Sequence, residues 1–162
     1  MAFPHDARMS PATPLLAYRI GDGRFPLFDG RGAMLAGGRW NSPGLPVIYG
    51  ALSQSCAMLE VLAHTNIGKL PQFHKMIIIE IDAAIQVEKI VAGQIPAWDH
   101  RNQIASRQYG DVWLRSQRSV ALIVPSVIAK YDHNIVINPL HPDFSKIRTS
   151  KPEEMMWDLR LF

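Results

Sequence analysis

Cysteine is almost absent from this sequence, because Cys56 is the single cysteine among its 162 residues. One cysteine cannot form a disulfide within the chain, and this favours a reducing compartment such as the cytosol. Long apolar runs are also absent, since no stretch approaches the roughly 20 residues of a membrane-spanning helix. The N-terminus lacks the positive start and apolar block of a secretory signal. We therefore expect a cytoplasmic protein with no membrane partner.

An excess of charge of one sign is missing as well. The chain carries 17 basic and 14 acidic residues, for a net charge of +3, and the basic residues are scattered. Proteins that bind nucleic acid concentrate Lys and Arg on one face or along one segment. We therefore expect no direct binding of nucleic acid. The mild positive charge would help to attract an anionic metabolite or an acidic protein.

Several functional motifs are missing too. The six histidines and Cys56 show none of the close spacings typical of metal ligands, so we expect no metal site. The glycines form neither a Walker phosphate loop nor a dinucleotide-binding G-x-G-x-x-G after the first predicted strand. Ser126 follows Pro125 and does not stand in the G-x-S-x-G sequence of many serine hydrolases. These absences argue against the commonest nucleotide-binding and hydrolase motifs.

The apolar patterns that are present predict an α+β fold. Apolar and β-branched runs predict strands over residues 15–20, 47–49, 76–81, 120–124 and 134–138. The run at 76–81 is nearly continuous, which is typical of a central strand. The alternation of Trp157, Leu159 and Leu161 predicts a last, half-exposed strand. Because strands and helices do not alternate regularly, we expect a mixed, mostly antiparallel sheet.

Two helices complete this prediction. Good helix formers follow Ser53, a suitable N-cap, and predict a helix over residues 54–65. A second helix is predicted over 104–117, with an interruption near Gly110. The domain is expected to occupy residues 15–162, after a poorly ordered lead-in at residues 1–14 that contains three prolines.

The most informative segment lies between residues 21 and 60. Residues 21–46 contain seven glycines, and a glycine-rich loop of this length in a compact domain is usually functional. Arg39 follows a Gly-Gly pair, Tyr49 lies on a short predicted strand, and Glu60 lies on the next helix. A cation for phosphate, a ring for a flat base and an acid for a sugar hydroxyl would suit a nucleotide-cleaving pocket.

Glu60 has an unusual place on its predicted helix. The apolar residues expected to form the buried stripe of this helix are Leu52, Cys56, Leu59 and Ala63. Glu60 lies four residues after Cys56, at the edge of that stripe. A carboxylate there is costly to bury unless it is paired, and Arg19 or Arg39 could be its partner. Cys56 itself is expected to be inert packing.

The residues alone leave a functional site and a structural role about equally open. Arg19 ends the first predicted strand and fits a pair with a surface carboxylate. Arg39 fits stacking on Trp40, and Tyr49 fits a core aromatic on a short strand. A non-catalytic interaction module, with a structural Arg–Glu pair and a loop that docks a protein, is therefore an alternative.

Several short motifs, taken in chain order, resemble the RES domain, a family named for an arginine, a glutamate and a serine. The motifs are Tyr18-Arg19, Gly38-Arg39-Trp40-Asn41-Ser42-Pro43-Gly44, Val47-Ile48-Tyr49, Leu59-Glu60, Val124-Pro125-Ser126 and Asn138-Pro139-Leu140-His141-Pro142. They span positions 18 to 142, and Asp158-Leu159-Arg160-Leu161 resembles the usual ending of that family. The ordered set is more specific than any one motif. Residues 85–101 carry no match.

The resemblance implies a fold similar to ADP-ribosyltransferase toxins and the role of the toxin in RES–Xre toxin–antitoxin pairs. Family members degrade NAD⁺ by hydrolysis or phosphorolysis, or transfer ADP-ribose to a protein, so NAD⁺ is expected as substrate without a further cofactor. An Xre-type antitoxin is the implied protein partner.

The resemblance also implies a pocket formed by Arg19, Arg39, Tyr49, Glu60 and Ser126. Glu60, Arg39 and Tyr49 would be catalytic, with Glu60 stabilising the charge that develops on the ribose. Tyr49 would stack on nicotinamide, and the two arginines would hold the pyrophosphate. Ser126 would orient Glu60 or a ribose hydroxyl.

Overall fold

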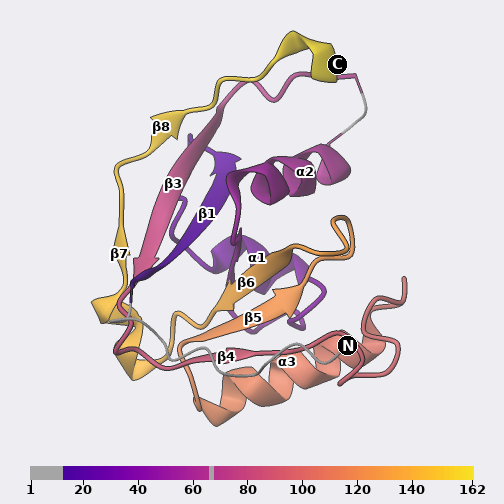
Figure 1. Cartoon of the computed structure of the whole chain (residues 1–162), viewed down its shortest axis with the longest axis vertical. Coiled ribbons are helices and arrows are strands. Elements are labelled where there is room, and N and C mark those ends of the chain that lie inside the picture. The colour runs from indigo at the N-terminus through magenta and orange to yellow at the C-terminus, as the bar shows by residue number, and fades with distance from the viewer. Residues whose placement is uncertain (1–12, 66–67) are drawn as a thin grey trace, which may run out of the picture.

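The computed structural model describes residues 13–65 and 68–162, which fold around one curved sheet of eight strands (Figure 1). The strands are β1 (Leu15–Asp22), β2 (Ile48–Ala51), β3 (His74–Ile81), β4 (Val87–Lys89), β5 (Ala121–Pro125), β6 (His133–Ile137), β7 (Arg148–Thr149) and β8 (Glu153–Glu154). Their order is β4-β5-β6-β2-β1-β3-β7, and β8 also pairs with β3. Among these strands, β4 and β5 run parallel and every other pair is antiparallel. The predicted α+β class with a mixed, mostly antiparallel sheet is confirmed.

The helices of the described chain are α1 (Arg31–Ala36), α2 (Gln54–His64) and α3 (Ile104–Ser116), with short 3₁₀ helices at Pro142–Lys146 and Leu159–Leu161. In Figure 1, α2 lies beside the end of β1, and side chains of α3 pack against β5 and β6. Ser53 caps α2 as predicted, because its Oγ accepts a hydrogen bond from the Cys56 backbone N at 3.1 Å. None of these helices is long and apolar enough to cross a membrane.

The centre of the sheet is buried on both faces. Leu122 of β5 and Val136 of β6 pack against Trp113 of α3, whereas Ile135 and Ile137 pack into the opposite cluster with residues of β1 and β3. Successive side chains of a strand point to opposite faces, which explains why neighbours join different clusters. Burial of each large aliphatic side chain stabilises the fold by roughly 1.5–3 kcal/mol. The central strands of the sheet are therefore held in place by tightly packed side chains on both faces.

The strand predicted over residues 76–81 begins at His74 and is paired on both sides, with β1 on one side and β7 and β8 on the other. The two short outer strands escaped prediction because each has two residues and little apolar content. Ion pairs support them instead: Lys75 contacts Glu154 at 3.1 Å, and Arg148 pairs with Glu80.

Helix α2 is turned relative to the prediction. Cys56 is buried as expected, but Leu59 is 43% exposed and Ala63 is also exposed, so the predicted stripe is wrong. The small side chain of Ala57 is buried next to Cys56 and lets the helix approach β1 and β2 closely. Four of the α2 residues that line the cavity, Ala57, Glu60, Val61 and His64, follow the spacing of one helix face. This rotation points Glu60 into the cavity.

Helix α3 is continuous, so the predicted interruption near Gly110 is wrong. Gly110 is present because the helix touches the backbone of the glycine-rich segment. A Cβ at this position would lie 1.8 Å from the carbonyl oxygen of Trp40. Glycine in a helix interior costs about 1 kcal/mol relative to alanine. Here the absence of a side chain at Gly110 permits the close contact between the helix and the loop.

Two other predictions need correction. The segment over residues 21–46 is not one long loop, because it contains α1. The strand predicted at residues 157–161 is a 3₁₀ helix that begins after Asp158, whose Oδ1 accepts a hydrogen bond from the Arg160 backbone N at 2.9 Å. Leu159 and Leu161 are exposed, so their alternation marks no buried face. Of the predicted lead-in, residues 1–12 lie outside the described residues.

Candidate active site

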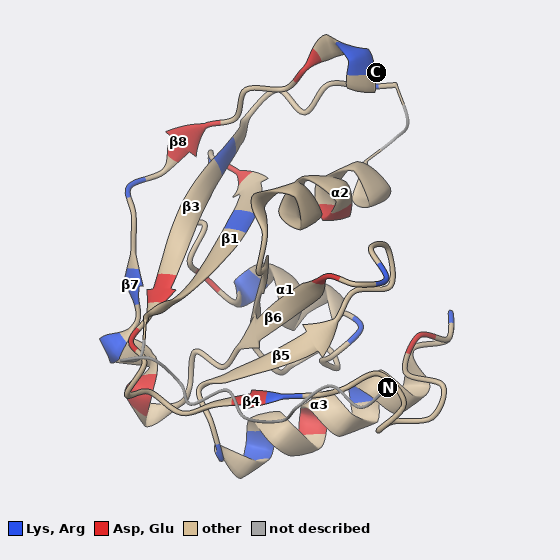
Figure 2. Cartoon of the chain, in the orientation of Figure 1, with Lys and Arg blue, Asp and Glu red and all other residues tan. Residues whose placement is uncertain are grey.

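A cavity of about 810 Å³ lies among α2, β1, β2 and the segment that follows α1. Its lining includes four of the five predicted site residues, namely Arg19, Arg39, Tyr49 and Glu60. Figure 2 shows a basic position on β1 and a single acidic position on α2, which are Arg19 and Glu60. Small-molecule pockets typically measure roughly 300–1,000 Å³. The cavity is therefore large enough for a small-molecule ligand.

Arg19 projects from β1 and is held by two backbone carbonyls. Its Nη1 donates to the Tyr49 oxygen at 2.7 Å, and its Nε donates to the Leu27 oxygen. Burial lowers the pKa of Arg19, and the negative charge of Asp29 acts in the opposite direction. A guanidinium remains charged in proteins. The prediction that Arg19 pairs with a surface carboxylate is wrong, since no ion pair involves it within the described ranges.

Arg39 is anchored in the same manner from the other side. Its Nη1 donates to the carbonyl oxygens of Trp98 and His100, both at 3.0 Å. Partial burial lowers the pKa of Arg39, and the nearby carboxylates Asp99 and Glu60 favour its charged form. Within the described chain, Nε and Nη2 of Arg39 have no hydrogen-bond partner. This side chain can therefore bind a ligand while it stays fixed in place.

The sequence had suggested that Arg39 stacks on Trp40, but this contact is not among the cation–π contacts of the described residues. Trp40 is buried and packs against Trp98 in a stacked arrangement and against Tyr109 edge-on. These aromatic contacts fix the backbone next to Arg39.

Tyr49 joins the loop to the sheet through its hydroxyl. The hydroxyl donates to Asn41 Oδ1 at 2.7 Å and accepts from the Trp40 backbone N at 2.9 Å. Burial raises the pKa of Tyr49 well above its ordinary value, so the phenol stays protonated and can donate. Gly38 allows this approach, because a Cβ there would lie 2.6 Å from the Tyr49 oxygen. Tyr49 therefore shapes the cavity wall as well as lining it.

Asn41 and Asp111 hold the rest of this loop. The fully buried Asn41 donates through Nδ2 to the carbonyl oxygens of Ala33 at 2.8 Å and Leu45 at 2.9 Å. Asp111 of α3 accepts from the backbone N of Ser42 at 2.8 Å and also from its hydroxyl. Buried hydrogen bonds of this kind fix one loop conformation, because leaving any group unpaired costs about 1–3 kcal/mol.

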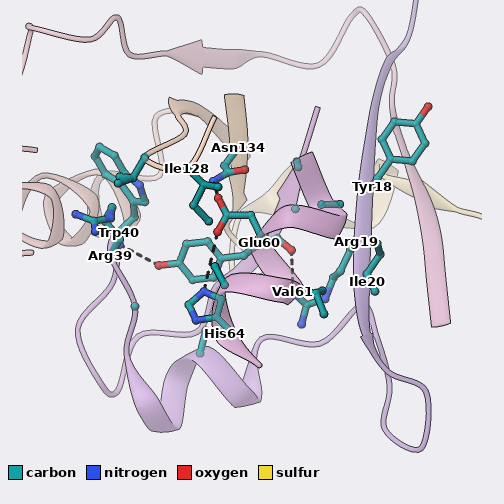
Figure 3. A pocket seen from close by; sticks show the side chains of 18 of the residues that line it. Tyr18, Arg19, Ile20, Arg39, Trp40, Glu60, Val61, His64, Ile128 and Asn134 are labelled. Carbon is teal, nitrogen blue, oxygen red and sulfur yellow. Dashed lines mark hydrogen bonds and ion pairs between the residues drawn. The ribbon is translucent and has the colours of Figure 1, made fainter. Parts of the chain in front are cut away.

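Glu60 lies between Asn134 and His64 in Figure 3. Its Oε1 accepts from Asn134 Nδ2 at 2.6 Å and from Ser126 Oγ at 3.4 Å, and its Oε2 lies 4.0 Å from His64 Nε2. The prediction that Arg19 or Arg39 pairs directly with Glu60 is wrong, because no arginine forms an ion pair with it among the residues described. The hydrogen-bond donors to the carboxylate are therefore neutral side chains, and Arg19 and Arg39 line the same cavity.

Ser126 lies behind Glu60 rather than in the cavity wall. The lining includes its neighbours Pro125 and Val127, whereas Ser126 is 3% exposed. Its Oγ accepts hydrogen bonds from the backbone N of Ile128 at 3.2 Å and of Ala129 at 3.1 Å. The structure thus places Ser126 where it can orient Glu60, one of the two roles considered from the sequence.

The described part of the chain contains no group of three or more His, Cys, Asp or Glu side chains that could hold a metal ion. The cavity instead contains two fixed guanidinium groups, one fixed carboxylate and apolar surface. This arrangement suits an organic ligand that carries both anionic groups and sugar hydroxyls.

The sequence matches the family described as "RES domain" over residues 16–158. The chain belongs to the RES domain family. Among its relatives, a protein named "Prs ADP-ribosylating toxin" from Sphingobium sp. (strain YBL2) is 38% identical over 137 residues, covering 82% of this chain and 85% of the relative. A protein named "Toxin Res" from Photorhabdus laumondii subsp. laumondii is 32% identical over 152 residues, covering 91% of this chain and 97% of the relative.

The fold of this RES domain is shared with a solved structure, that of the M. tuberculosis MbcT–MbcA toxin–antitoxin complex. The TM-score is 0.71 at 19% sequence identity, over 89% of this chain and 85% of the solved chain. All five predicted site residues fall within the part of the chain that matches the RES family.

Sequence reasoning about this RES domain missed Asn134 and His64, both of which line the cavity next to Glu60. His64 could have been found from its position one helical turn after Glu60. Asn134 had a weaker signal, namely a polar residue at the start of an otherwise apolar predicted strand. Its pairing with Glu60 depends on the sheet order, which brings β6 beside β2, and the sequence does not reveal that order.

Proposed function

We propose that this RES domain is the toxin of a toxin–antitoxin pair and that it cleaves the nicotinamide–ribose bond of NAD⁺. The observation that carries the proposal is the composition of the cavity. Among the described residues, two guanidinium groups that form no ion pair line the same cavity as one carboxylate, whose Oε2 lies 4.0 Å from His64 Nε2. The names of the relatives, "Toxin Res" and "Prs ADP-ribosylating toxin", support the same reading.

The two arginines would bind the pyrophosphate of NAD⁺. Each guanidinium already donates to backbone carbonyls, so it is held in place without losing its charge. Arginine binds phosphate oxygens through charge-assisted and often bidentate hydrogen bonds. Nε and Nη2 of Arg39 are the best placed donors, because the described residues leave them unpaired.

The acid would act at the sugar. When the bond between C1″ of the nicotinamide ribose and the pyridinium nitrogen breaks, its electron pair goes to the nitrogen and nicotinamide leaves as a neutral molecule. The ribose is left with oxocarbenium-like positive charge. A fixed carboxylate near that charge stabilises the transition state, and preorganised groups of this type can supply about 3 kcal/mol or more. Glu60 is our candidate, with Tyr49 stacking on nicotinamide and Ser126 orienting Glu60.

Water or inorganic phosphate would complete the reaction. Attack of water oxygen on C1″ and loss of a proton from that water gives ADP-ribose, whereas attack of a phosphate oxygen on C1″ gives ADP-ribose 1″-phosphate. Neither route needs an oxidant, a reductant or a separate cofactor, because NAD⁺ is the substrate. We place the reaction in the cytoplasm, where NAD⁺ is available.

A second candidate function is transfer of ADP-ribose to a protein side chain from the same cavity. It is favoured by the relative named "Prs ADP-ribosylating toxin", which is 38% identical to this chain. The first half of the reaction would be the same, and a nucleophilic side chain of a target protein would replace water. A protein antitoxin is the partner that we propose for either activity, supported by the solved toxin–antitoxin complex of the same fold, and we expect it to be of the Xre type.

Product analysis tests these proposals together. Purified protein is incubated with NAD⁺, with and without inorganic phosphate, and nicotinamide release is measured by chromatography. We expect nicotinamide together with ADP-ribose, or with its 1″-phosphate when phosphate is present. Radiolabel from adenylate-labelled NAD⁺ that stays on protein from a cell extract would instead favour ADP-ribose transfer. Absence of nicotinamide release without phosphate, with phosphate and with the cell extract would contradict the enzyme proposal and favour a non-catalytic interaction module.

A further inference from the structure

Asn134 makes the shortest polar contact of Glu60 in the described chain. It lies on β6, lines the cavity, and donates from Nδ2 to Glu60 Oε1 at 2.6 Å (Figure 3). A hydrogen bond from a neutral amide to an ionised carboxylate is charge-assisted and is stronger than one between neutral groups. The contact joins residues 74 positions apart in the sequence.

The direction of the Asn134 amide is fixed from its other side. The Cys56 thiol donates to Asn134 Oδ1 at 3.5 Å. Burial raises the pKa of the Cys56 thiol, so the sulfur keeps the proton that it donates. With the amide reversed, an oxygen atom would face the carboxylate oxygen of Glu60 at hydrogen-bond distance and would repel it. The network therefore selects the orientation in which the NH₂ group faces Glu60.

Ser126 completes this arrangement with its single proton. Its Oγ accepts two backbone hydrogen bonds, from Ile128 and Ala129, which occupy both lone pairs. The hydroxyl proton is then directed toward Glu60 Oε1. Oε1 thus receives two donors, and Oε2 faces the cavity side with the exposed His64 ring at 4.0 Å.

We propose that Asn134 is a positioning residue that holds Glu60 Oε1, so that Oε2 is presented to the ribose of the substrate, and that Cys56 sets the direction of the Asn134 amide. The proposal rests on the proposed cleavage of NAD⁺. It gives the one cysteine of the chain a role beyond packing, and it adds to the site a residue that the sequence did not point to. Asn134 acts through Glu60 rather than on the reacting atoms.

Two substitutions at Asn134 test this role through the split between kcat and KM. Asn134→Ala removes the hydrogen-bond donor to Glu60 and is expected to lower kcat about tenfold or more. Hydrogen bonds to charged groups contribute more than those between neutral groups, so the carboxylate loses a strong positional restraint. The KM of this variant for NAD⁺ is expected to stay within about threefold, since the arginines that would bind the pyrophosphate are untouched. Asn134→Asp places a second carboxylate beside Glu60 and is expected to lower kcat further and to move the acid limb of its pH profile upward.

Asn138 offers a matched control just beyond the end of the same strand. It is buried and donates to the Leu114 carbonyl oxygen at 3.1 Å, away from the cavity. Asn138→Ala is expected to lower the unfolding temperature and to leave kcat and KM unchanged below that temperature. An unchanged kcat in Asn134→Ala, or an equal loss of kcat in Asn138→Ala, would overturn the positioning role.

A crystallographic comparison keeps the test independent of activity. We expect one Glu60 side-chain conformation in the wild type and a displaced or multiple conformation in Asn134→Ala. Retention of the wild-type Glu60 conformation in that variant would overturn the proposal. If wild-type protein releases no nicotinamide, the proposed function fails, and this structural comparison still decides whether Asn134 holds Glu60.

The role of Cys56 has its own pair of variants. Cys56→Ser keeps a donor at the same place and is expected to retain kcat within about twofold. Cys56→Ala lacks the donor and is expected to lower kcat about threefold or more, with KM unchanged. Equal kcat values for the two variants would remove Cys56 from the proposal while leaving Asn134 in it.

Discussion

Charged side chains in the cavity and on the outer surface of this protein have different partners. On the surface, arginines pair with carboxylates: Arg24 with Asp22, Arg31 with Asp29, Arg118 with Glu88, Arg148 with Glu80 and Arg160 with Asp158. In the cavity, Arg19 and Arg39 are held by carbonyl oxygens, and Glu60 is held by an amide and a hydroxyl. Surface arginines therefore have partners of opposite charge, whereas Arg19, Arg39 and Glu60 in the cavity are held by uncharged hydrogen-bonding groups.

The difference matters because a neutral partner fixes a charged group without cancelling its charge. An exposed ion pair is worth only about 0–1 kcal/mol, because solvent screens it. A partly buried charge without a counter-ion interacts more strongly with a ligand of opposite sign. The cavity is thus prepared for a ligand, whereas the surface pairs mainly satisfy each other. This view predicts a graded set of effects.

The largest effect is expected for Glu60→Gln, which removes the charge and keeps the shape. We expect kcat for nicotinamide release to fall at least about a hundredfold, equivalent to roughly 2.7 kcal/mol of activation free energy. The fold should be retained, as checked by circular dichroism and the unfolding temperature. Equal kcat values for the wild type and Glu60→Gln would show that the negative charge of Glu60 does not contribute to catalysis.

The next effect concerns the support of the cavity wall. Gly110→Ala would place a methyl group against the Trp40 carbonyl oxygen, and we expect it to lower the free energy of unfolding by at least about 2 kcal/mol. Gly32→Ala is a matched control in α1, where an added Cβ meets nothing within 4 Å. Denaturant unfolding should show little change or a gain for that control. Similar losses for both variants would contradict a special contact at Gly110.

A smaller effect is expected for Arg39→Lys, which keeps the charge and removes the planar fork. We expect the KM for NAD⁺ to rise about tenfold, which corresponds to roughly 1.4 kcal/mol of binding free energy. Steady-state kinetics of nicotinamide release would measure it. If KM and kcat both remain at wild-type values, Arg39 has no part in binding the pyrophosphate.

The smallest effect is expected for the same substitution on the surface. Arg148→Lys keeps a cation opposite Glu80 on the outer strand, and we expect unchanged kinetics and a stability change within about 0.5 kcal/mol. Measured beside Arg39→Lys, it separates loss of guanidinium geometry in the cavity from any general effect of the substitution. A KM change of similar size in both variants would remove the distinction between cavity and surface.

Much of the fold could be predicted, because its strands are marked by local sequence. Five of the six predicted strands and both predicted helices are present, with ends shifted by a few residues. The errors have specific causes. Gly110 had the local signature of a helix breaker, but it is required by a contact with Trp40, about 70 positions earlier in the sequence. The apolar alternation at Leu159 and Leu161 had no partner strand to pair with.

The site could be predicted less completely. Arg19, Arg39, Tyr49 and Glu60 were identified largely through resemblance to a family, and they line one cavity. Their partners could not be predicted, because carbonyl oxygens look the same in every sequence. Asn134 was missed for a related reason: its role follows from the pairing of Ala51 with Asn134 across β2 and β6.

The anchoring of Arg39 has a consequence for how such sequences diverge. Trp98 and His100 hold Arg39 with main-chain oxygens, and both lie in residues 85–101, which contain none of the short motifs that carried the resemblance. A main-chain oxygen survives nearly any substitution of the side chain attached to it. The hydrogen bonds to Arg39 therefore depend on the path of the chain and not on the side chain of His100, whereas Trp98 also stacks on Trp40. A relative can therefore anchor the same arginine with a different residue at the position of His100.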